Sequence, residues 1–403
     1  MHFMNRLLRS FALFLLGSFS IFAQPDPGTL GPQAQGWYSE TVSRDSRSMN
    51  CRIYYPALSD GENAPIDASQ GQYPIIAFGH GFLMQTGYYI SLLKQLSSHG
   101  FIVIAPQFSD TQHGELGKDL IACLNHIKNL SRTPGNRFFN LADTSRTGVS
   151  GHSMGGGASL LSTIYDTTIV VAAPFAAAET TPTIIGSINN TKSWIYLISA
   201  QNDGITPPAT TQIPMYNNTP GKKGLLTLKG GNHTKFMDTG IFDWTDPRGY
   251  LSRTRQIYLS QKYLTAVMRY LLKGENHYGT FAFGDSAAAD TSVVLETTVG
   301  VKDEAQTLPG EFRVSQNYPN PFNPVTRVEY TLPVSSRVTV EVFRITGEKV
   351  TIFHAGVVER GLNFFEIDAG KLGLTSGVYI YRVSATGEDG RRFSISRKFV
   401  LLR

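Results

Sequence analysis

The sequence predicts two domains: a mainly parallel β-sheet covered by helices on both faces, followed by a small sandwich made only of β-strands. Between residues 37 and 284, short apolar runs alternate with amphipathic helical stretches, which is the pattern of an α/β sheet. After residue 312 the pattern changes to short strands separated by turn residues. The chain has 403 residues, of which 41% are hydrophobic, so it is long and apolar enough to fill two cores.

The first 23 residues have the features of a signal peptide. Arg6 and Arg9 precede an apolar run over residues 11–17, and a small residue, Ala23, stands where cleavage is expected. A membrane anchor would need roughly 20 apolar residues, and this run is shorter. We therefore expect residues 1–23 to direct export, and the Pro-, Gly- and Gln-rich residues 24–36 to be loose.

Within residues 37–284, each predicted strand is a short apolar run, and each predicted helix carries apolar residues three or four positions apart. Gly100 and Gly274 follow two of the helices and act as stop signals. In chain order we predict strands 52–56 and 73–79, helix 88–99, strand 101–106, helix 118–131, strand 147–152, helix 155–165, strands 168–173, 193–200 and 224–229, and helix 252–273.

Residues 285–311 are rich in Ala, Asp, Thr and Val without a clear period, so we predict a linker there. Residues 312–403 then alternate apolar and polar positions between Gly, Asp and Ser turns. This length and spacing are typical of a β-sandwich. The predicted strands cover residues 325–332, 337–345, 363–367, 377–384 and 392–402.

Residues 151–155, Gly-His-Ser-Met-Gly, match the pattern G-x-S-x-G between a predicted strand and a predicted helix. A serine hydroxyl becomes a nucleophile when a tight turn exposes it beside a base, and the flanking glycines allow such a turn. In a chain with 39 glycines the string alone arises easily by chance, so the strand before it and the helix after it carry the argument. Ser153 is the predicted nucleophile.

The base of such a site should lie downstream, in the chain order Ser, acid, His. Of the three downstream histidines, His354 belongs to the second domain and His277 follows the last long helix. His233 stands in a glycine-rich loop directly after a strand, where catalytic side chains are common. We predict His233 as the base, and we interpret His152, beside the nucleophile, as structural.

For the acid, Asp203 stands in the loop after strand 193–200. There it can hold the tautomer of His233 and stabilise the imidazolium that forms when Ser153 loses its proton. Asp166 is better explained as a turn residue at a helix end, and three further aspartates follow His233 and break the order: Asp238, Asp243 and Asp246. The predicted triad is Ser153, Asp203 and His233.

An oxyanion formed at such a site needs two backbone N–H donors. The first comes from Met154, the residue after the nucleophile. The second is expected from the loop after strand 73–79, where we choose Phe82, with His80 and Gly81 shaping the loop. The Phe82 side chain is also a candidate to cover an apolar acyl group.

Cys51 and Cys123 are the two cysteines of the chain. In an exported protein they can form a disulfide, and two buried free thiols are an equally good interpretation. Two cysteines cannot build a zinc site alone, and no cluster of His and Cys has the spacing of metal ligands. We predict no metal and no other cofactor.

The net charge of +5 lies in the last quarter of the chain. Residues 313–403 hold 13 Lys or Arg against 8 Asp or Glu, whereas residues 1–312 hold 23 of each. No run of five basic residues occurs, so we do not expect a nucleic acid as partner.

Four segments of the first domain resemble the bacterial cutinase and polyester (PET) hydrolase branch of the α/β-hydrolases. They are Gly-His-Ser-Met-Gly-Gly-Gly from residue 151, Ser-His-Gly-Phe-Ile-Val-Ile-Ala from 98, Asn-Asp-Gly-Ile-Thr-Pro from 202 and Gly-Asn-His from 231. The resemblance covers about residues 36–284. It implies an α/β-hydrolase fold and hydrolysis of carboxylic esters by Ser153, Asp203 and His233, with Phe82 and Met154 donating to the oxyanion.

One residue departs from that family's pattern. Such enzymes place a tryptophan soon after the strand that follows the nucleophile helix, where it stacks on aromatic substrates. Here Ala178 occupies that place, with Phe175 nearby as a candidate substrate contact. Ester hydrolysis is expected, and activity on aromatic polyesters is in question.

The C-terminal region is similar to type IX secretion C-terminal sorting domains. The similarity rests on Gln-Asn-Tyr-Pro-Asn-Pro-Phe-Asn-Pro from residue 316, Ser-Gly-Val-Tyr-Ile-Tyr-Arg from 376 and the final Arg-Lys-Phe-Val-Leu-Leu-Arg from 397. It implies recognition by the type IX machinery, passage through the periplasm and across the outer membrane, then release or surface attachment. A carbohydrate-binding module is the alternative for this region.

These observations favour a secreted, monomeric serine esterase with an open site. Only 49 residues separate Ser153 from Asp203, and the predicted elements use most of them, so no lid domain fits there. An uncovered site suits bulky or polymeric esters. The alternatives are a lipase or serine peptidase of the same fold, or a non-catalytic surface binding protein on a hydrolase scaffold.

Overall fold

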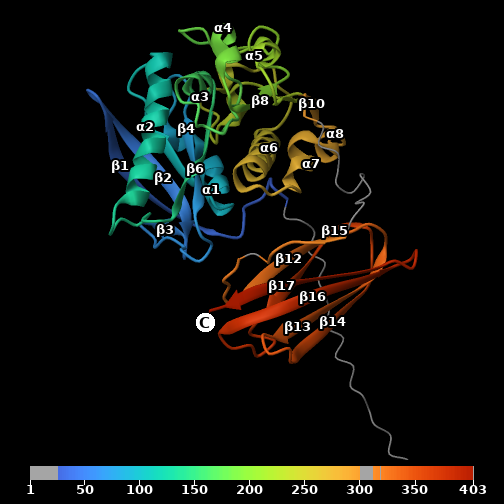
Figure 1. The fold of residues 1–403 in the computed structure, drawn as a ribbon. Helices are drawn as coiled ribbons and strands as arrows, with labels where there is room; N and C mark the ends of the chain where they lie inside the picture. Colours follow the sequence, from blue (N-terminus) through green and yellow to red (C-terminus); the bar gives the residue numbers. More distant parts are fainter. Residues whose placement is uncertain (1–25, 300–311, 318, 403) are drawn as a thin grey trace, which may run out of the picture.

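The computed structural model describes residues 26–299, 312–317 and 319–402, so the predicted signal peptide, residues 1–23, lies outside the described residues. Figure 1 shows an α/β region, coloured blue to yellow, and a region of β-strands, coloured orange to red. This is the predicted fold class. No helix among these described residues is long and apolar enough to cross a membrane.

The first region is built on one ten-stranded sheet in the order β10-β9-β8-β7-β6-β4-β5-β2-β1-β3. The six strands from β9 to β5 run parallel, and β10 and β2 pair antiparallel at the two ends of this parallel block. The strands are β1 (Ala34–Arg44), β2 (Arg47–Ala57), β3 (Gly61–Glu62), β4 (Tyr73–Gly79), β5 (Ile102–Pro106), β6 (Ala142–Gly151), β7 (Val171–Ala172), β8 (Trp194–Ala200), β9 (Lys223–Leu228) and β10 (Val293–Thr297).

Helices cover both faces of this sheet (Figure 1). Strand β4 shows why: Ile75 and Ala77 point into one core with α2 and α3, while Ile76 and Phe78 point into another with α1 and α6. The α-helices are α1 (Ile90–Ser98), α2 (His113–Arg132), α3 (Met154–Tyr165), α4 (Ile184–Ser187), α5 (Gln212–Asn218), α6 (Arg253–Lys273), α7 (Tyr278–Phe283) and α8 (Asp285–Ala288). Short 3₁₀ turns are η1 (Thr86–Tyr89), η2 (Ile188–Asn190), η3 (Thr234–Phe236) and η4 (Asp243–Thr245).

The expectation that residues 24–36 are loose is wrong for the described part of that segment. Residues 26–33 pack against the end of α1, where Gly31 N donates to Ser98 Oγ at 2.8 Å and Gln95 Nε2 donates to the Pro27 carbonyl at 2.8 Å. His99 Nε2 lies 2.8 Å from the Thr29 carbonyl oxygen. These partners are more than sixty residues away in the chain, so local composition did not reveal them.

The predicted linker at 285–311 also begins too early. Residues 285–288 form α8, and Val293 to Thr297 form β10, which extends the sheet by pairing with β9. The Val293 side chain is buried in the core shared with α6. The remaining residues of the predicted linker, 300–311, lie outside the described residues.

The second region contains two antiparallel sheets, β11-β12-β15 and β14-β13-β16-β17, around one core. Alternate side chains of β16, from Tyr379 to Ala385, point into that core, as expected for a sandwich strand. The strands are β11 (Arg313–Val314), β12 (Val325–Leu332), β13 (Ser336–Arg344), β14 (Lys349–Val358), β15 (Gly361–Asp368), β16 (Gly377–Gly387) and β17 (Arg392–Leu401). Strands β11 and β14 were not predicted.

Cys51 on β2 and Cys123 on α2 meet in the core between the sheet and α2. Both are free, buried thiols with their Sγ atoms 3.7 Å apart, so the disulfide considered from the sequence is not formed in this structure. The contact with Cys51 and burial raise the pKa of the Cys123 thiol.

Candidate active site

Ser153 stands on the sharp turn between β6 and α3. Its backbone has φ +55° and ψ −116°, a conformation that residues other than glycine seldom adopt. Hydrogen bonds hold the turn on both sides: His152 N donates to the Gly79 carbonyl, and Ser153 N to the Phe175 carbonyl, each at 3.0 Å. The serine is thus presented at the carboxyl end of β6, where ligands bind in parallel sheets.

Glycines are required around this turn because the backbones approach closely. A Cβ atom on Gly155 would lie 2.2 Å from the Gly79 carbonyl oxygen, and one on Gly151 would lie 2.4 Å from the Gly155 carbonyl oxygen. Neither contact can be relieved by moving a flexible side chain. The glycines of the G-x-S-x-G pattern therefore have a steric function here.

Asp203 and His233 meet at the carboxyl ends of β8 and β9. Asp203 Oδ2 lies 2.8 Å from His233 Nδ1, and both side chains are buried. Asp203 Oδ1 accepts hydrogen bonds from Ile205 N at 2.9 Å and from Thr206 N at 2.7 Å. Because a carboxylate can only accept, Nδ1 of His233 donates, which leaves Nε2 of the neutral ring free to accept a proton.

His152 links the nucleophile turn to the base. Its ring lies 4.6 Å from the His233 ring, and its Nδ1 lies 2.8 Å from the Tyr89 hydroxyl oxygen. Burial, together with repulsion from the His233 ring when that ring is protonated, holds the pKa of His152 well below its usual value, so the His152 ring stays neutral. Among the described residues, Ser153 Oγ makes no hydrogen bond to His233, so that contact of the predicted triad remains a prediction.

The loop after β4 (the oxyanion loop) contains Phe82, the second of the two predicted oxyanion donors. Gly81 to Met84 form a turn closed by Met84 N donating to the Gly81 carbonyl at 3.1 Å, with Leu83 at φ +57°. His80 supports the loop, because its Nδ1 lies 2.8 Å from the Gly81 carbonyl and its Nε2 accepts from Phe108 N at 2.9 Å. Burial lowers the pKa of His80, in keeping with a neutral ring in this arrangement.

Met154 is the first residue of α3, so its N–H belongs to the helix turn whose donors have no partner within the helix. The Phe82 side chain is 51% exposed. Leu83, in the same loop, and Ile205, in the loop after β8 that carries Asp203 (the acid loop), are exposed as well. The sequence singled out Met154 and Phe82 but not these other two apolar side chains.

Phe175 does not line the site as the sequence suggested. Its side chain is 1% exposed and stacks on Phe236 in the core, with ring centres 5.4 Å apart. Its backbone explains why it is buried: Phe175 N and O bond to the Gly151 carbonyl and to Ser153 N, which places the residue directly beneath the nucleophile turn. Ala178 N donates to the Ser153 carbonyl at 3.0 Å, so Ala178 is the residue of this segment that borders the turn from outside the core.

The loop after β9 that carries His233 (the base loop) is held by two residues that the sequence did not identify as part of the site. Asp246 Oδ2 accepts from His233 N at 2.8 Å, and Gln256 on α6 bonds to both N and O of Asn232, at 3.1 and 2.7 Å. Asp246 was set aside because it follows His233 in the chain. That order excludes it as the triad acid but not as a partner of the His233 backbone.

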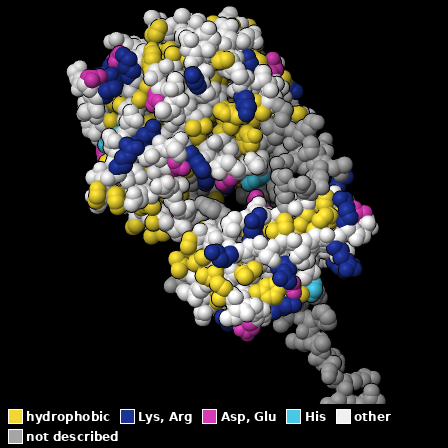
Figure 2. Space-filling model, viewed as in Figure 1, with side chains coloured by type: hydrophobic (Ala, Val, Ile, Leu, Met, Phe, Trp, Pro, Cys, Tyr) yellow, Lys and Arg dark blue, Asp and Glu magenta, His cyan; other side chains and the backbone are white. Residues whose placement is uncertain are grey.

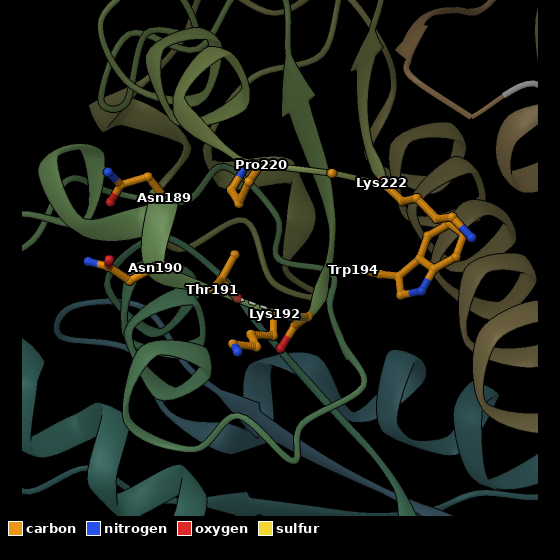
Figure 3. A pocket seen from close by; sticks show the side chains of 9 residues that line it. Asn189, Asn190, Thr191, Lys192, Trp194, Pro220 and Lys222 are labelled. Carbon is orange, nitrogen blue, oxygen red and sulfur yellow. Dashed lines mark hydrogen bonds between the residues drawn. The ribbon is translucent and has the colours of Figure 1, made fainter.

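The structure also contains a shallow hollow of about 610 Å³, shown in Figure 3, lined by residues 189–194 and 220–222. Lys222 Nζ lies 4.7 Å from the centre of the Trp194 ring on its rim. The hollow is at the amino ends of β8 and β9, whereas Asp203 and His233 follow the carboxyl ends of the same strands. It is therefore not part of the candidate active site.

Within residues 26–299, 312–317 and 319–402, no group of three or more His, Cys, Asp or Glu could hold a metal ion. On the face shown in Figure 2, Lys and Arg side chains are scattered among hydrophobic and acidic ones. They form no continuous basic stripe on that face.

Most of the chain matches a known protein family. Residues 27–294 match the family described as PET hydrolase-like. The chain is 32% identical over 209 residues to cutinase 1 of Thermobifida cellulosilytica, a match that covers 48% of this chain and 70% of the relative. A cutinase of Thermobifida fusca is also 32% identical, covering 48% and 60%. The bis(hydroxyethyl) terephthalate hydrolase of Streptomyces coelicolor is 28% identical over 197 residues, covering 46% and 54%.

The C-terminal region has its own match. Residues 316–400 match the family described as secretion system C-terminal sorting domain, which includes most of the described β-sandwich. This agrees with the type IX sorting domain expected from the sequence and makes the protein a secreted or cell-surface protein. By its first and larger region, whose sheet, nucleophile turn and match over residues 27–294 all agree, the chain belongs to the PET hydrolase-like family.

Proposed function

We propose that the protein is an exported serine hydrolase that cleaves carboxylic esters through Ser153, His233 and Asp203. The observation that carries this proposal is the buried contact of 2.8 Å between Asp203 Oδ2 and His233 Nδ1, beside a serine on a turn with positive φ. The three residues also follow the chain order of this fold. The names of the relatives, cutinase and bis(hydroxyethyl) terephthalate hydrolase, support the same class of reaction.

The reaction begins when Ser153 Oγ attacks the ester carbonyl carbon while His233 Nε2 accepts the hydroxyl proton. The carbonyl oxygen becomes an oxyanion, which accepts hydrogen bonds from the N–H groups of Met154 and Phe82. Collapse of this intermediate breaks the ester C–O bond, and His233 returns the proton to the leaving alcohol. Water then attacks the acyl-enzyme carbonyl carbon while His233 Nε2 takes a proton from it. The bond between Ser153 Oγ and the acyl carbon breaks, His233 returns the proton to Ser153 Oγ, and the carboxylic acid leaves. Asp203 stabilises the imidazolium in both halves.

The substrates we propose are bulky or polymeric esters with apolar acyl groups. Phe82 and Leu83, on the loop of the proposed oxyanion donor, and Ile205, on the loop that carries Asp203, offer exposed apolar side chains. With Ala178 beside the nucleophile turn, no tryptophan at that position can stack on an aromatic ring. We therefore expect aliphatic polyesters to be better substrates than aromatic ones.

The two regions have separate functions in this proposal. The catalytic unit extends from Asp26 to Val299, and residues from Phe312 onward form the sorting domain that delivers the monomeric enzyme across the outer membrane. No catalytic residue comes from the second region.

The test compares the purified protein with its Ser153→Ala variant on p-nitrophenyl butyrate, on p-nitrophenyl esters of increasing chain length, and on aliphatic and aromatic polyester films. We expect hydrolysis that depends on Ser153. A protein that hydrolyses no ester but binds the films would support a surface binding protein instead. Cleavage of peptides, or of long-chain triglycerides alone, would support a peptidase or a lipase.

A further inference from the structure

The acid loop and the base loop of the candidate site share one buried carboxylate. Asp246 follows η4, in the segment between His233 and α6, and it is 1% exposed. Its Oδ2 atom accepts from two backbone donors, His233 N at 2.8 Å and Gly204 N at 3.2 Å. One donor belongs to the base itself, and the other to the residue directly after the acid Asp203.

A buried carboxylate lowers the stability of the fold unless it accepts hydrogen bonds and is paired with a positive charge. The other oxygen, Oδ1, makes no hydrogen bond to a described residue, and Arg248 Nε lies 3.5 Å from it. The Arg248 side chain is largely exposed, so the pairing is only partly shielded from water. The hydrogen bonds to the Asp246 carboxylate among the described residues therefore come from two backbone N–H groups, one in each loop.

The surroundings hold Asp246 in this position. Its carbonyl oxygen accepts from Asn232 Nδ2 at 2.5 Å, so side chain and backbone both bind the base loop. The Arg248 guanidinium lies over Gly204, where a Cβ atom would be 1.1 Å from Arg248 Nη2. Any side chain at position 204 would therefore displace Arg248. The segment 246–248 fits against the acid loop and the base loop together.

We propose that Asp246 is a positioning residue for the triad, which sets the separation of the Asp203 loop and the His233 loop by accepting a hydrogen bond from each. The proposal rests on the proposed function, since it assigns Asp246 a part in placing those two catalytic side chains. Misplacement of a catalytic group by about 1 Å can cost roughly 100-fold in rate. Loss of the shared acceptor should therefore lower kcat rather than weaken substrate binding.

The test uses the full chain with Asp246→Ala, Asp246→Asn and, as a matched control, Asp238→Asn, an exposed carboxylate that bonds Ser91 outside the site. Two measurements are made: kcat and KM on p-nitrophenyl butyrate, and the rate and final extent of labelling by a fluorophosphonate, which reacts with an activated serine. The final extent counts folded sites, whereas the labelling rate reports how well the serine is activated.

For Asp246→Ala we expect kcat and the labelling rate to fall about 10- to 100-fold, with KM nearly unchanged and labelling complete. Asp246→Asn keeps an oxygen that can accept both N–H groups, so its rates should recover to within about fivefold of wild type. Asp238→Asn should behave as wild type. If Asp246→Ala is insoluble, Asp246→Ser replaces it, because its hydroxyl is too short to reach both donors.

Three results would overturn the proposal: a wild-type labelling rate in Asp246→Ala, a lower extent of labelling at an unchanged rate, or an Asn variant as slow as the Ala variant. The second result would mean that Asp246 serves folding only. Failure of the proposed function is recognised separately, because then the wild-type protein itself would not be labelled, or Ser153→Ala would be labelled equally fast.

Discussion

The α/β region and the β-sandwich of this chain bury very different side chains. Around the loops at the carboxyl ends of its strands, the α/β region buries polar and titratable groups, including His80, His152, Asp203, His233 and Asp246. Among the described residues of the sandwich, the buried polar side chains are only Asn317, Thr326 and Ser336. The other side chains of the sandwich core are aliphatic or aromatic, tyrosines included, and its strands alternate regularly between core and solvent.

The backbone differs in the same way. Among described residues other than glycine, positive φ angles occur only in the α/β region, and Leu83, Ser153 and Ala176 are three of the six positions. Leu83 follows Phe82, the proposed oxyanion donor, and Ser153 is the proposed nucleophile. Buried polar groups and strained backbone each cost stability and persist where other contacts hold them. Both features therefore support the proposal that the first region carries the chemistry. Four experiments test this difference between the two regions.

The largest effect is expected from Ser153→Ala. Removal of the nucleophile of a serine triad typically lowers kcat by a factor on the order of 10⁶. The thermal unfolding temperature should change little, because the substitution removes only one hydroxyl group. The measurement is the initial rate on p-nitrophenyl butyrate, with circular dichroism as the control for folding. A variant that keeps a substantial rate would exclude Ser153 as the nucleophile.

Acid should destabilise the α/β region through His99. Burial and the cations Arg269 and Lys273 lower the pKa of His99 from 6.5 to about 4, although its bond to the Thr29 carbonyl opposes this. Between these two values the unfolded chain takes up a proton that the folded one does not, so stability is full above about pH 6.5 and falls until about pH 4. The loss amounts to about 3 kcal/mol at most.

This loss can be followed in the α/β region alone, because all three tryptophans, Trp37, Trp194 and Trp244, belong to it. Urea unfolding monitored by tryptophan fluorescence should show a smaller change between pH 7 and pH 4.5 in His99→Gln than in the wild type. The sandwich has one histidine, the exposed His354, so His354→Gln is the matched control. If the free energy of unfolding falls equally in all three proteins between pH 7 and pH 4.5, His99 is not responsible for the loss of stability.

Thiol accessibility tests the packing of the α/β core. Cys51 and Cys123 are fully buried, and the raised pKa of the Cys123 thiol disfavours its reactive thiolate form. The purified protein, kept without reductant, should therefore release no chromophore from Ellman's reagent when folded and two equivalents in urea. Two equivalents from the folded protein would mean that this core is open. If no chromophore is released in urea, the two cysteines have formed a disulfide after export.

The smallest effect on the reaction is expected from deletion of residues 312–403. Every proposed catalytic residue lies in the first region, so the truncated enzyme should keep kcat and KM within about twofold on p-nitrophenyl butyrate. Secretion should nevertheless stop, and the enzyme should accumulate in the periplasm of its host because the sorting domain is missing. A large loss of rate in a folded truncated enzyme would make the sandwich part of the site. Normal secretion without it would favour a binding module.

Much of the fold and of the candidate site could be predicted because it depends on local patterns and on chain order. Apolar runs alternating with amphipathic stretches identify a parallel sheet, and strand-flanked Gly-His-Ser-Met-Gly identifies the Ser153 turn. His233 and Asp203 were found because each follows a strand in the required order, and the structure brings them within 2.8 Å of each other. These features need no knowledge of distant contacts.

The features that local patterns did not predict depend on partners far away in the chain. Residues 26–33 are ordered by the end of α1, and β10 is a strand because β9 offers a free edge, although the composition of both segments resembles that of linkers. Phe175 is buried because its backbone bonds place it under the Ser153 turn, which no local pattern indicates. Asp246 was excluded as the acid by chain order, yet folding brings its carboxylate to the backbones of both catalytic loops. Periodicity reports which face of an element is apolar, whereas the partner of each polar group is fixed only when distant segments pack together.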